Sequence, residues 1–239
     1  KQLSTKKQTT ELNVLREYLQ HLFLSYFYQK ENSNNILFKG GTALKIIYDS
    51  PRFSEDLDFS GAELSKDKLE SMLMETLSEV EQEQVNVELN EAKTTSGGYL
   101  AIYRGSLLEQ DIKIQLEISF RDKQLKAEPD LISQDFIPPY TLLHLSEKQI
   151  TAEKLNALLD RGKPRDWYDL YFILRSRLEI GEKFLTTDRG QLKEKLLNQL
   201  DDLSTSSLKR DLKPLLPVSH HNILKDFNQN LKREIKRHL

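Results

Sequence analysis

The sequence contains no cysteine among its 239 residues. This absence excludes disulfide bonds, thiol nucleophiles and cysteine-based zinc sites, and it fits the reducing cytoplasm, where we expect the protein to be located. No apolar run approaches the roughly 18 residues of a membrane span, and no secretory signal is evident, so we expect no membrane partner. Because the chain starts with Lys1 rather than methionine, we expect the native start to lie upstream.

Glycine and proline are scarce, at nine and seven residues, which argues against a low-complexity chain. The formal net charge is only −2, and this excludes a protein that binds nucleic acid through its bulk charge. Hydrophobic residues make up 38% of the chain and charged residues 30%, so a real core is combined with a heavily charged surface. The length suits one large domain or two modest ones.

One stretch, residues 36–60, combines the features of a phosphate site. It begins with an apolar run of buried-strand type, which leads directly into Gly40 and Gly41. Glycine lets the backbone turn sharply and approach a ligand closely, and Thr42 then opens a short apolar helix that we expect to end near Tyr48. Because a helix N-terminus presents free N–H groups and the positive end of the helix dipole, this turn suits a phosphate group.

Two carboxylates follow in the same stretch. Asp56 and Asp58 flank Leu57, and side chains at positions i and i+2 of a strand project from the same face. We therefore expect the two carboxylates to lie side by side, while Leu57 and Phe59 face the core. Adjacent carboxylates with no evident paired base repel each other unless a cation lies between them. Magnesium, held by these oxygens and by the phosphates of a nucleotide, is the natural candidate.

Three β-like segments follow, at residues 85–89, 99–103 and 112–118. In the last of them Lys113, Gln115 and Glu117 share one face, and aliphatic residues share the other. Glu117 therefore has two interpretations. It is either an ordinary polar residue on a half-exposed strand, or the third carboxylate of the metal site, contributed by a strand beside that of Asp56 and Asp58.

Helical periodicity predicts two helices in the first half of the chain, over residues 11–31 and 65–81, and we expect the first to buttress the sheet. Residues 63–91 hold nine acidic and two basic residues. They form either a solvated face or a docking surface for a basic partner. Residues 121–139 are charged and contain three prolines, so we expect a connection and the domain boundary there. From residue 140 to residue 239 we expect helices throughout.

The second half opens with a capping-box pattern at residues 146–149, which predicts a helix that runs to Arg161. Gly162 and Pro164 end this helix, and the next one begins directly after them. Lys154 and Arg161 are nearly two turns apart, so they lie on one face of the helix. The two charges form either a solvated basic edge or part of a binding site.

The C-terminal stretch, residues 208–239, is basic, with eight lysines and arginines against three acidic residues. It forms either a plain solvated surface or a surface that receives the phosphate backbone of an RNA. Adjacent His220 and His221 cannot easily share one metal ion from a helix, so we assign no metal there. In the helix that follows Pro164, we expect Trp167 and Tyr168 to lie in the core rather than to stack on bases.

Two motif blocks together resemble a known family. The first block is Lys39-Gly40-Gly41-Thr42, followed by Arg52-x-Ser54-x-Asp56-Leu57-Asp58-Phe59. The second block is Glu153-Lys154-Leu155-x-Ala157-Leu158-x-x-Arg161-Gly162-Lys163-x-Arg165-Asp166-x-Tyr168-Asp169-Leu170. In their residue types and in their order along the chain, they resemble the AbiEii/AbiGii toxin family of type IV toxin–antitoxin and phage-defence systems. That family includes the MenT toxins and shares the core of the DNA polymerase beta-like nucleotidyltransferase superfamily.

The resemblance implies both a fold and an activity. The implied fold is an α/β (α+β) nucleotidyltransferase core with a mixed sheet over residues 1–138. An α-helical domain over residues 139–239 would complete the active-site cleft. The implied enzyme is a Mg²⁺-dependent nucleotidyltransferase toxin that transfers a nucleoside monophosphate from a nucleoside triphosphate to an RNA acceptor, namely the tRNA 3′ end. Its setting would be a toxin–antitoxin or abortive-infection system with a cognate antitoxin.

The resemblance also implies roles for particular residues. The implied catalytic residues are Asp56, Asp58, Lys154 and Asp166. The implied nucleotide-binding residues are Lys39, Gly40, Gly41, Thr42, Ser54 and Arg161, and the implied metal ligands are Asp56, Asp58 and Glu117. Lys154 would neutralise triphosphate charge in the transition state. Asp166 would orient a neighbouring cation, Lys154 or Arg165, or position the acceptor, whereas Asp169 would cap or pair within its helix.

Two rival hypotheses remain open at this point. One is a nucleotidyltransferase that modifies a small molecule, of the kind that inactivates antibiotics, and the nature of the acceptor would distinguish it. The other is a non-catalytic protein that binds a partner through a degenerate core. Against the second hypothesis, both expected aspartates are present, although the proposed third acid is Glu117 rather than an aspartate. Magnesium-dependent nucleotide binding would separate the catalytic hypotheses from the non-catalytic one.

Overall fold

The computed structural model describes residues 1–62, 64–121 and 124–239, which divide into two compact units. Unit 1 consists of Lys1–Ser4, Thr10–Asp49 and Phe53–Leu145. Unit 2 consists of Thr5–Thr9, Ser50–Arg52 and Ser146–Leu239. Both units are therefore discontinuous in the sequence. Within the described ranges, no helix has the length and apolar character that a membrane span requires.

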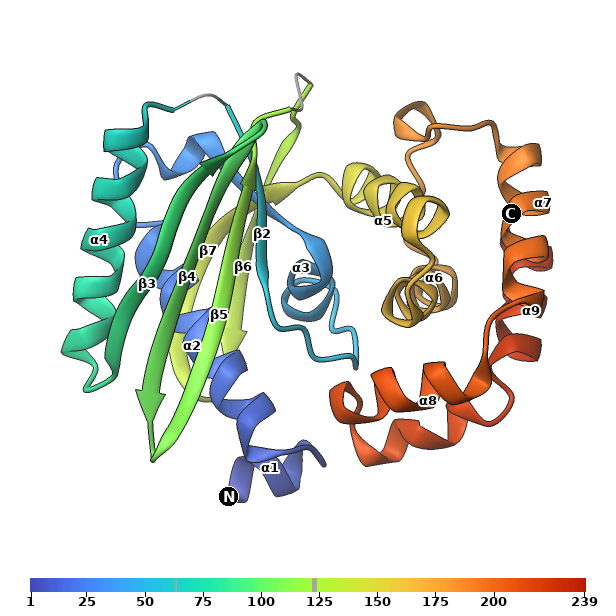
Figure 1. The fold of residues 1–239 in the computed structure, drawn as a ribbon, viewed down its shortest axis with the longest axis horizontal. Helices are drawn as coiled ribbons and strands as arrows, with labels where there is room; N and C mark the ends of the chain where they lie inside the picture. Colours follow the sequence, from blue (N-terminus) through green and yellow to red (C-terminus); the bar gives the residue numbers. More distant parts are fainter. Residues whose placement is uncertain (63, 122–123) are drawn as a thin grey trace. The chain divides into compact units, whose positions relative to one another are not determined.

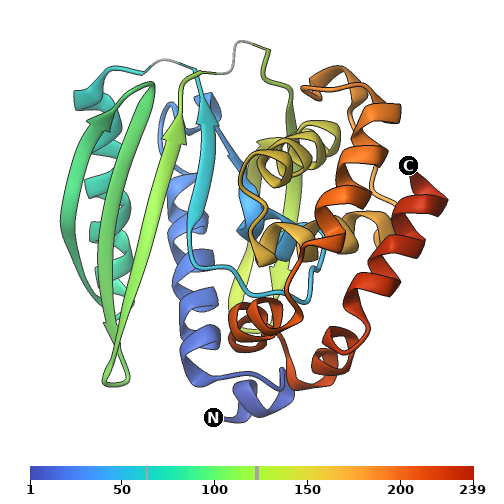
Figure 2. The same ribbon diagram turned by 45° about the vertical axis from the view of Figure 1, so that its right-hand side comes forward.

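Unit 1 is built on a seven-stranded sheet with the order β3-β4-β5-β2-β1-β7-β6, shown in Figures 1 and 2. The strands are β1 (Ile36–Lys39), β2 (Leu57–Gly61), β3 (Asn86–Thr95), β4 (Gly98–Leu107), β5 (Gln110–Ser119), β6 (Ala127–Gln134) and β7 (Ile137–Leu145). The pairs β1–β7 and β2–β5 are parallel, and the other pairs are antiparallel. The expected mixed sheet is thereby confirmed, as are the three predicted strands before residue 120.

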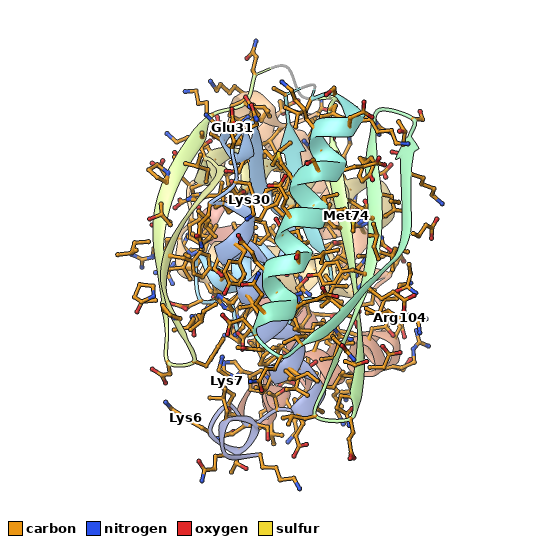
Figure 3. All side chains as sticks on the ribbon, turned by 90° about the vertical axis from the view of Figure 1, so that its left-hand side faces the viewer. Lys6, Lys7, Lys30, Glu31, Met74 and Arg104 are labelled. Carbon is orange, nitrogen blue, oxygen red and sulfur yellow. The ribbon has the colours of Figure 1, made fainter. Side chains whose placement is uncertain are left out.

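Two helices cover one face of this sheet, α2 (Glu11–Phe27) and α4 (Lys66–Gln82). The buttressing role expected for the first helix is confirmed. α2 packs on β5 and β7 as well as on α4, and Nζ of Lys30 lies 2.6 Å from Oε1 of Glu79 on α4. Figure 3 looks onto this face, with α4 in front and Lys30 beside it. A 3₁₀ turn, η1 (Ser33–Asn35), connects the segment after α2 to β1.

Aromatic rings fill the space between α2 and the sheet. Phe23 stacks on Tyr103 of β4 at 5.3 Å between ring centroids, and Phe27 lies 5.6 Å from Phe59 of β2. Phe38 of β1 continues the cluster at 5.5 Å from Phe59. All five side chains are buried, and burying a ring of this kind contributes about 1.5–3 kcal/mol. Because Phe59 points toward α2, its neighbour Asp58 projects from the opposite face.

The turn between β1 and the next helix is tighter than expected. Helix α3 (Gly40–Ile46) follows β1 without an intervening loop residue, so it starts at Gly40 and not at Thr42. It packs against β1 and β2. Strand β2 begins at Leu57, so Asp56 is the residue immediately before the strand rather than a member of it.

The stretch 121–139 was expected as a connection, and this prediction is wrong. Most of its described residues belong to strands, β6 and the start of β7, which pair as an antiparallel hairpin. Pro129 lies on β6, the edge strand of the sheet, where proline is tolerated, and Pro138 and Pro139 lie at the start of β7. The sheet extends to Leu145, so the boundary expected between residues 138 and 139 falls inside β7, and the helical part starts after it.

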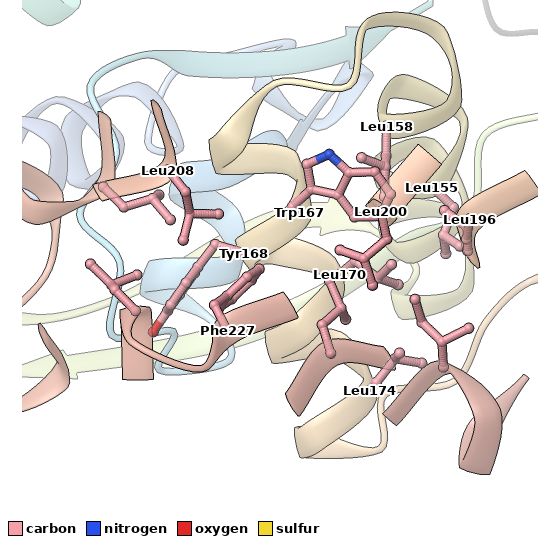
Figure 4. Close-up of a cluster of buried hydrophobic side chains, with 14 of the residues drawn as sticks. Leu155, Leu158, Trp167, Tyr168, Leu170, Leu174, Leu196, Leu200, Leu208 and Phe227 are labelled. Carbon is pink, nitrogen blue, oxygen red and sulfur yellow. The ribbon is translucent and has the colours of Figure 1, made fainter. Parts of the chain in front are cut away.

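Unit 2 is helical. Its helices are α5 (Glu147–Arg161), α6 (Pro164–Ser176), α7 (Arg189–Asp201), α8 (Thr205–Leu212) and α9 (Phe227–His238), with the 3₁₀ turns η2 (Glu182–Phe184), η3 (Lys213–Leu215) and η4 (Val218–Leu224). Gly162, at φ +58°, ends α5, and Pro164 begins α6, as predicted. Leucines surround Trp167 and Tyr168, which are both 2% exposed (Figure 4). Their expected place in the core is confirmed.

The N-terminal segment contributes to both units. Helix α1 (Gln2–Lys6) begins in unit 1, whereas Thr5–Thr9 belong to unit 2. There, Gln8 receives two backbone hydrogen bonds, from the N–H of Val218 to its carbonyl at 2.9 Å and from the N–H of Ser219 to its side chain at 3.1 Å. This anchor ties the start of the chain to η4 near its end.

Candidate active site

In unit 1, Asp58 lies in a row of polar side chains across three strands. It is paired in register with Lys39 of the antiparallel strand β1 and with Glu117 of the parallel strand β5. Residues opposite each other in register share a face, and neighbouring strands are about 4.8 Å apart. The expectation that Glu117 stands on a strand beside the Asp58 strand is confirmed. Gln115 donates a hydrogen bond to Oε1 of Glu117 at 2.6 Å, which orients this carboxylate.

Gly40 is the residue against which the Asp58 carboxylate packs. Its φ is +85°, a conformation that disfavours any side chain. A Cβ at position 40 would lie 2.7 Å from Cβ and 2.8 Å from Cγ of Asp58, and would overlap Oδ2. Only glycine therefore leaves room for Asp58 in this position, and the turn at the start of α3 lies directly beside the carboxylate.

Asp56 is held through its backbone. The Thr42 hydroxyl is fully buried and donates a hydrogen bond to the carbonyl of Asp56. The preceding loop is tied to α2, because the Gln20 amide donates to the carbonyl of Ser54 at 3.0 Å. In this structure the Thr42 side chain thus fixes the residue just before β2, and only its backbone N–H is left for the phosphate role predicted for it.

These residues suit a magnesium ion that arrives with a nucleotide. The candidate metal ligands at and beside Asp58 are carboxylate oxygens, and oxygen atoms are the ligands that Mg²⁺ prefers. Over the described residues, no three histidine or acidic side chains are grouped so that they could hold a metal ion by themselves. Mg²⁺ is commonly held by one or two carboxylates together with substrate phosphates, so Asp56 and Asp58 fit that arrangement. The role of Glu117 as a third ligand stays a prediction.

In unit 2, Asp169 of α6 is the centre of a buried ionic cluster. Arg52 donates to it twice, from Nε to Oδ1 at 2.8 Å and from a terminal nitrogen to Oδ2 at 2.9 Å. Lys154 of α5 approaches Oδ2 to 3.0 Å. The side chains of Asp169, Arg52 and Lys154 are only 1%, 3% and 11% exposed. Buried charges are tolerated when they are paired and hydrogen-bonded in this way.

The pKa of Asp169 reflects this pairing. Burial by itself would raise the pKa of the carboxyl group, but the charges of Arg52 and Lys154 and their hydrogen bonds hold the pKa below its ordinary value. For Arg52, burial opposes the charge, yet Asp169 keeps the pKa of the guanidinium raised. Asp169 and Arg52 are therefore both charged at neutral pH, and the Asp169 carboxylate lies between two basic side chains.

A second ion pair joins the two helices. Arg161, near the end of α5, donates to both oxygens of Asp166 at 2.8 and 2.7 Å. Asp166 has no exposed side-chain surface, whereas Arg161 is 39% exposed. The expectation that Asp166 would orient Lys154 is therefore wrong, because Asp169 is the partner of Lys154 and Asp166 is the partner of Arg161. Lys154 is also not the solvated charge of the alternative interpretation, since it is largely buried.

Arg52 stands in the first motif block, but the sequence alone assigns it no role. Its partner Asp169 lies 117 positions further on, so no local spacing could reveal the pair. The available signal was an arginine, with one residue between it and Ser54, in a loop that leads to two aspartates. Within unit 1 the structure brings together Lys39, Gly40, Asp58 and Glu117. Within unit 2 it brings together Arg52, Lys154 and Asp169, and separately Arg161 and Asp166.

Comparison with known families decides the identity of this chain. The family profile described as "Nucleotidyl transferase AbiEii toxin, Type IV TA system" matches residues 22–235. The chain belongs to this family. The resemblance inferred from the two motif blocks is thereby confirmed, and the chain is a nucleotidyltransferase. Membership in this family implies a nucleoside triphosphate as substrate and an antitoxin as partner. Among curated proteins, none matches the sequence.

Solved structures show the same fold as this AbiEii-family chain. JHP933 from Helicobacter pylori is similar with a TM-score of 0.62 and 23% identity, and the match covers 96% of this chain and 92% of that one. MenT4, the nucleotidyltransferase toxin Rv2826c from Mycobacterium tuberculosis H37Rv, is similar with a TM-score of 0.62 and 19% identity. That match covers 94% of this chain and 82% of MenT4. The α/β fold expected from the sequence, with helices after the sheet, is confirmed.

Proposed function

We propose that this AbiEii-family enzyme transfers a nucleoside monophosphate from a nucleoside triphosphate to a hydroxyl of an RNA, the tRNA 3′ end being the intended acceptor, in a Mg²⁺-dependent reaction. Its setting would be a cytoplasmic toxin–antitoxin system directed against phage. The observation that carries the proposal is the Lys39–Asp58–Glu117 row, together with Gly40 packed on Asp58. A carboxylate that lies beside a glycine turn and a lysine suits a nucleoside triphosphate that binds together with Mg²⁺.

The proposed reaction is a single displacement at phosphorus. The acceptor hydroxyl oxygen forms a bond to the α-phosphorus, the bond from that phosphorus to the bridging oxygen breaks, and pyrophosphate leaves. The hydroxyl proton passes to solvent or to a nearby carboxylate. Bound Mg²⁺ would neutralise charge on the reacting oxygens. Asp56 and Asp58 would bind it, Glu117 would assist, and the backbone of Gly40, Gly41 and Thr42 would receive phosphate oxygens.

The cations of unit 2 have a proposed role of their own. Lys154 and Arg161 are each held by a buried carboxylate, Asp169 and Asp166. We propose that both cations bind the triphosphate, so that Asp166 is a positioning residue that acts through Arg161. A cation whose geometry is fixed in advance stabilises developing phosphate charge without reorganising. For Lys39 and Ser54, next to the turn and next to Asp56, we propose contacts to the nucleotide.

The test is a transfer assay with both kinds of acceptor. The purified protein is incubated with each of the four α-labelled ribonucleoside triphosphates, Mg²⁺, and either total RNA or an aminoglycoside. We expect label in the tRNA band and none on the aminoglycoside. Asp58→Asn should lower transfer at least about 100-fold, because a metal-binding carboxylate acts on the charge of the transition state.

The matched control is Asp111→Asn at the start of β5, where Asp111 forms an exposed ion pair with Arg104 at 3.1 Å. It should leave transfer unchanged, since exposed pairs contribute little. Full activity in a folded Asp58→Asn protein, or transfer that survives removal of divalent cations, would overturn the metal-dependent mechanism. Label on the aminoglycoside alone would replace RNA by a small molecule as the acceptor.

A further inference from the structure

We propose that a cavity beside α2 binds the side chain of an arginine, presented by a basic segment of a partner protein. The cavity has a volume of about 200 Å³ and lies within unit 1. Residues of α2 form one wall, residues from the β6–β7 turn and the start of β7 form the other, and Glu83 at the C-terminal end of α4 lies at its margin. A volume of this size takes one side chain, not a folded domain.

Four aromatic side chains line the cavity, those of Tyr18, Tyr26, Phe136 and Tyr140, and ring contacts hold three of them in place. Tyr18 and Phe136 meet edge to face with ring centroids 6.0 Å apart. His21 packs edge to face on Phe136 at 5.4 Å and on Tyr140 at 5.9 Å, and its Nδ1 lies 2.8 Å from the Tyr140 hydroxyl. Rings fixed in this way present preformed surfaces that attract a cation.

Glu83 supplies the negative charge. The Tyr26 hydroxyl donates to its Oε1 at 2.5 Å, and because of this hydrogen bond and burial the pKa of Tyr26 is raised to about 12. Burial and the charge of Glu83 also raise the pKa of Tyr18. The negative charge of Glu83 therefore acts on two aromatic residues that line the cavity, Tyr26 and Tyr18. A carboxylate has about four acceptor sites, so an exposed Glu83 can accept further hydrogen bonds from a ligand.

The surroundings favour a cation over an anion. The cavity is lined by neither lysine nor arginine among the described residues. Glu83 is the C-cap of α4, where the carbonyl end of the helix carries partial negative charge, and Glu81, two residues before it, is also exposed. A nucleic acid would bring phosphates into this field and be repelled. The acidic stretch 63–91 thus has a specific docking point at its end, rather than only a diffuse charge.

Arginine fits this combination better than lysine does. Its guanidinium group is planar, stacks on aromatic faces and donates in pairs to a carboxylate, whereas the lysine ammonium is compact and strongly hydrated. The cavity lies on the α2 face of the sheet, and Asp58 projects from the opposite face. A ligand in the cavity therefore leaves the proposed metal-binding carboxylates uncovered, and variants in the cavity should keep nucleotidyl transfer unchanged.

The probe is a blocked pentapeptide with a single central arginine, Gly-Ser-Arg-Ser-Gly, titrated into the full chain and followed by amide NMR. Matched peptides carry citrulline or lysine in place of arginine. We expect shifts in α2 and at the end of α4, with citrulline, which has the shape of arginine without its charge, binding at least about fivefold more weakly. Lysine should lie between the two.

Two variants and one control locate the site. Glu83→Gln and Phe136→Leu should each weaken the arginine peptide at least about fivefold, with circular dichroism and transfer activity unchanged. Glu75→Gln removes an exposed carboxylate of the same helix that pairs with Ser71, and should leave the affinity unchanged. The proposal would be overturned by equal affinity for the arginine and citrulline peptides, or by an unaltered affinity of Glu83→Gln for the arginine peptide. It would also be overturned if Glu75→Gln lost as much affinity as Glu83→Gln, or if a single-stranded RNA competed with the peptide.

Discussion

At the scale of single residues, Asp58 depends on a neighbour that has no side chain. The carboxylate occupies the space that a Cβ of Gly40 would take, and the positive φ of Gly40 makes the tight passage from β1 to α3 possible. Two requirements, one steric and one conformational, therefore act on the same position. A substitution at Gly40 should disturb Asp58 before it disturbs the rest of the sheet.

We expect Gly40→Ala to reduce nucleotidyl transfer at least about 100-fold, because it displaces the proposed metal-binding carboxylate. It should also lower the free energy of unfolding by about 1–3 kcal/mol, since a side chain is forced into a strained conformation. Transfer assays and urea unfolding measure the two effects.

Gly190→Ala is the control. A Cβ there would have its nearest contact at 3.4 Å, to Oδ1 of Asp188, and the position lies in helix α7. Alanine favours a helix over glycine, so stability should be unchanged or slightly higher and transfer unchanged. Wild-type activity in Gly40→Ala would mean that Asp58 can move without loss, and would contradict the role assigned to the turn.

Which site residues the sequence could predict follows from their spacing. The neighbouring positions of Asp58 and Glu117 could be predicted, because alternation along a strand is local and the register that pairs them follows once β2 and β5 are neighbours. The pairing of Arg52 with Asp169 could not be found, because 117 positions separate them. The sequence could not show that Lys154 pairs with Asp169 and not with Asp166, because both aspartates lie within one turn of α6 and either could face α5.

At the scale of elements, α5 and α6 are joined by two ion pairs as well as by the leucine core. Lys154–Asp169 lies near the middle of α5 and Arg161–Asp166 at its end. Gly162 and Pro164 produce the sharp turn that brings the two helices together. Each cation of α5 is therefore held at a fixed position by α6, which is what a binding site for phosphate requires.

Lys154→Ala tests whether this arrangement serves catalysis. We expect kcat/KM to fall by about 100-fold, or about 3 kcal/mol of transition-state stabilisation, and triphosphate affinity to fall in calorimetry. Stability should also fall, by about 1–3 kcal/mol, because buried Asp169 loses one of its two cations. All measurements should be made well below the midpoint of thermal unfolding, so that the protein remains folded.

Lys148→Ala in the same helix is the matched control, since Lys148 is 55% exposed and its partner Glu179 is 69% exposed. Removing it should change stability by less than about 0.5 kcal/mol and leave kinetics unaltered. A Lys154→Ala protein that is destabilised but fully active would show that the cluster only supports the fold.

Among the elements, the β6–β7 hairpin was the one that the sequence concealed. Pro129, Pro138 and Pro139 suggested a connection, but Pro129 lies on the edge strand and the other two lie at the start of β7. The pairing of β7 with β1 occurs at His144, well past the prolines. The helices were predictable because their apolar periodicity is long, whereas an edge strand exposed on both faces carries no alternation.

At the scale of the whole chain, stability should depend on pH through Asp169. Its pKa is lowered in the folded state and ordinary, about 3.9, in the unfolded chain. Unfolding therefore takes up a proton between the two values. The stabilisation from this group is fully present above about pH 4 and is lost as the pH falls through the lower, folded value.

Asp169→Asn should accordingly cost about 3–5 kcal/mol at pH 7, because Arg52 and Lys154 are left without a buried anion. The difference from wild type should stay constant between pH 5 and pH 8. It should shrink below about pH 4, as the wild-type carboxylate takes up a proton. Urea unfolding at fixed ionic strength measures it. Asp160→Asn, at an exposed position of α5, is the control and should cost little at any pH. A difference that grew on acidification would contradict the assignment.

The discontinuous composition of unit 2 bears on how such genes can recombine. Lys154 and Asp169 are encoded close together, but Arg52 is encoded 117 codons before Asp169. A crossover between two homologous genes anywhere in that interval yields a hybrid with Arg52 from one parent and Asp169 from the other. If the first parent lacks the arginine, the hybrid inherits a buried carboxylate that only Lys154 neutralises, at a cost of several kcal/mol. We therefore expect exchange of C-terminal halves to be best tolerated between parents that match at both positions of this pair.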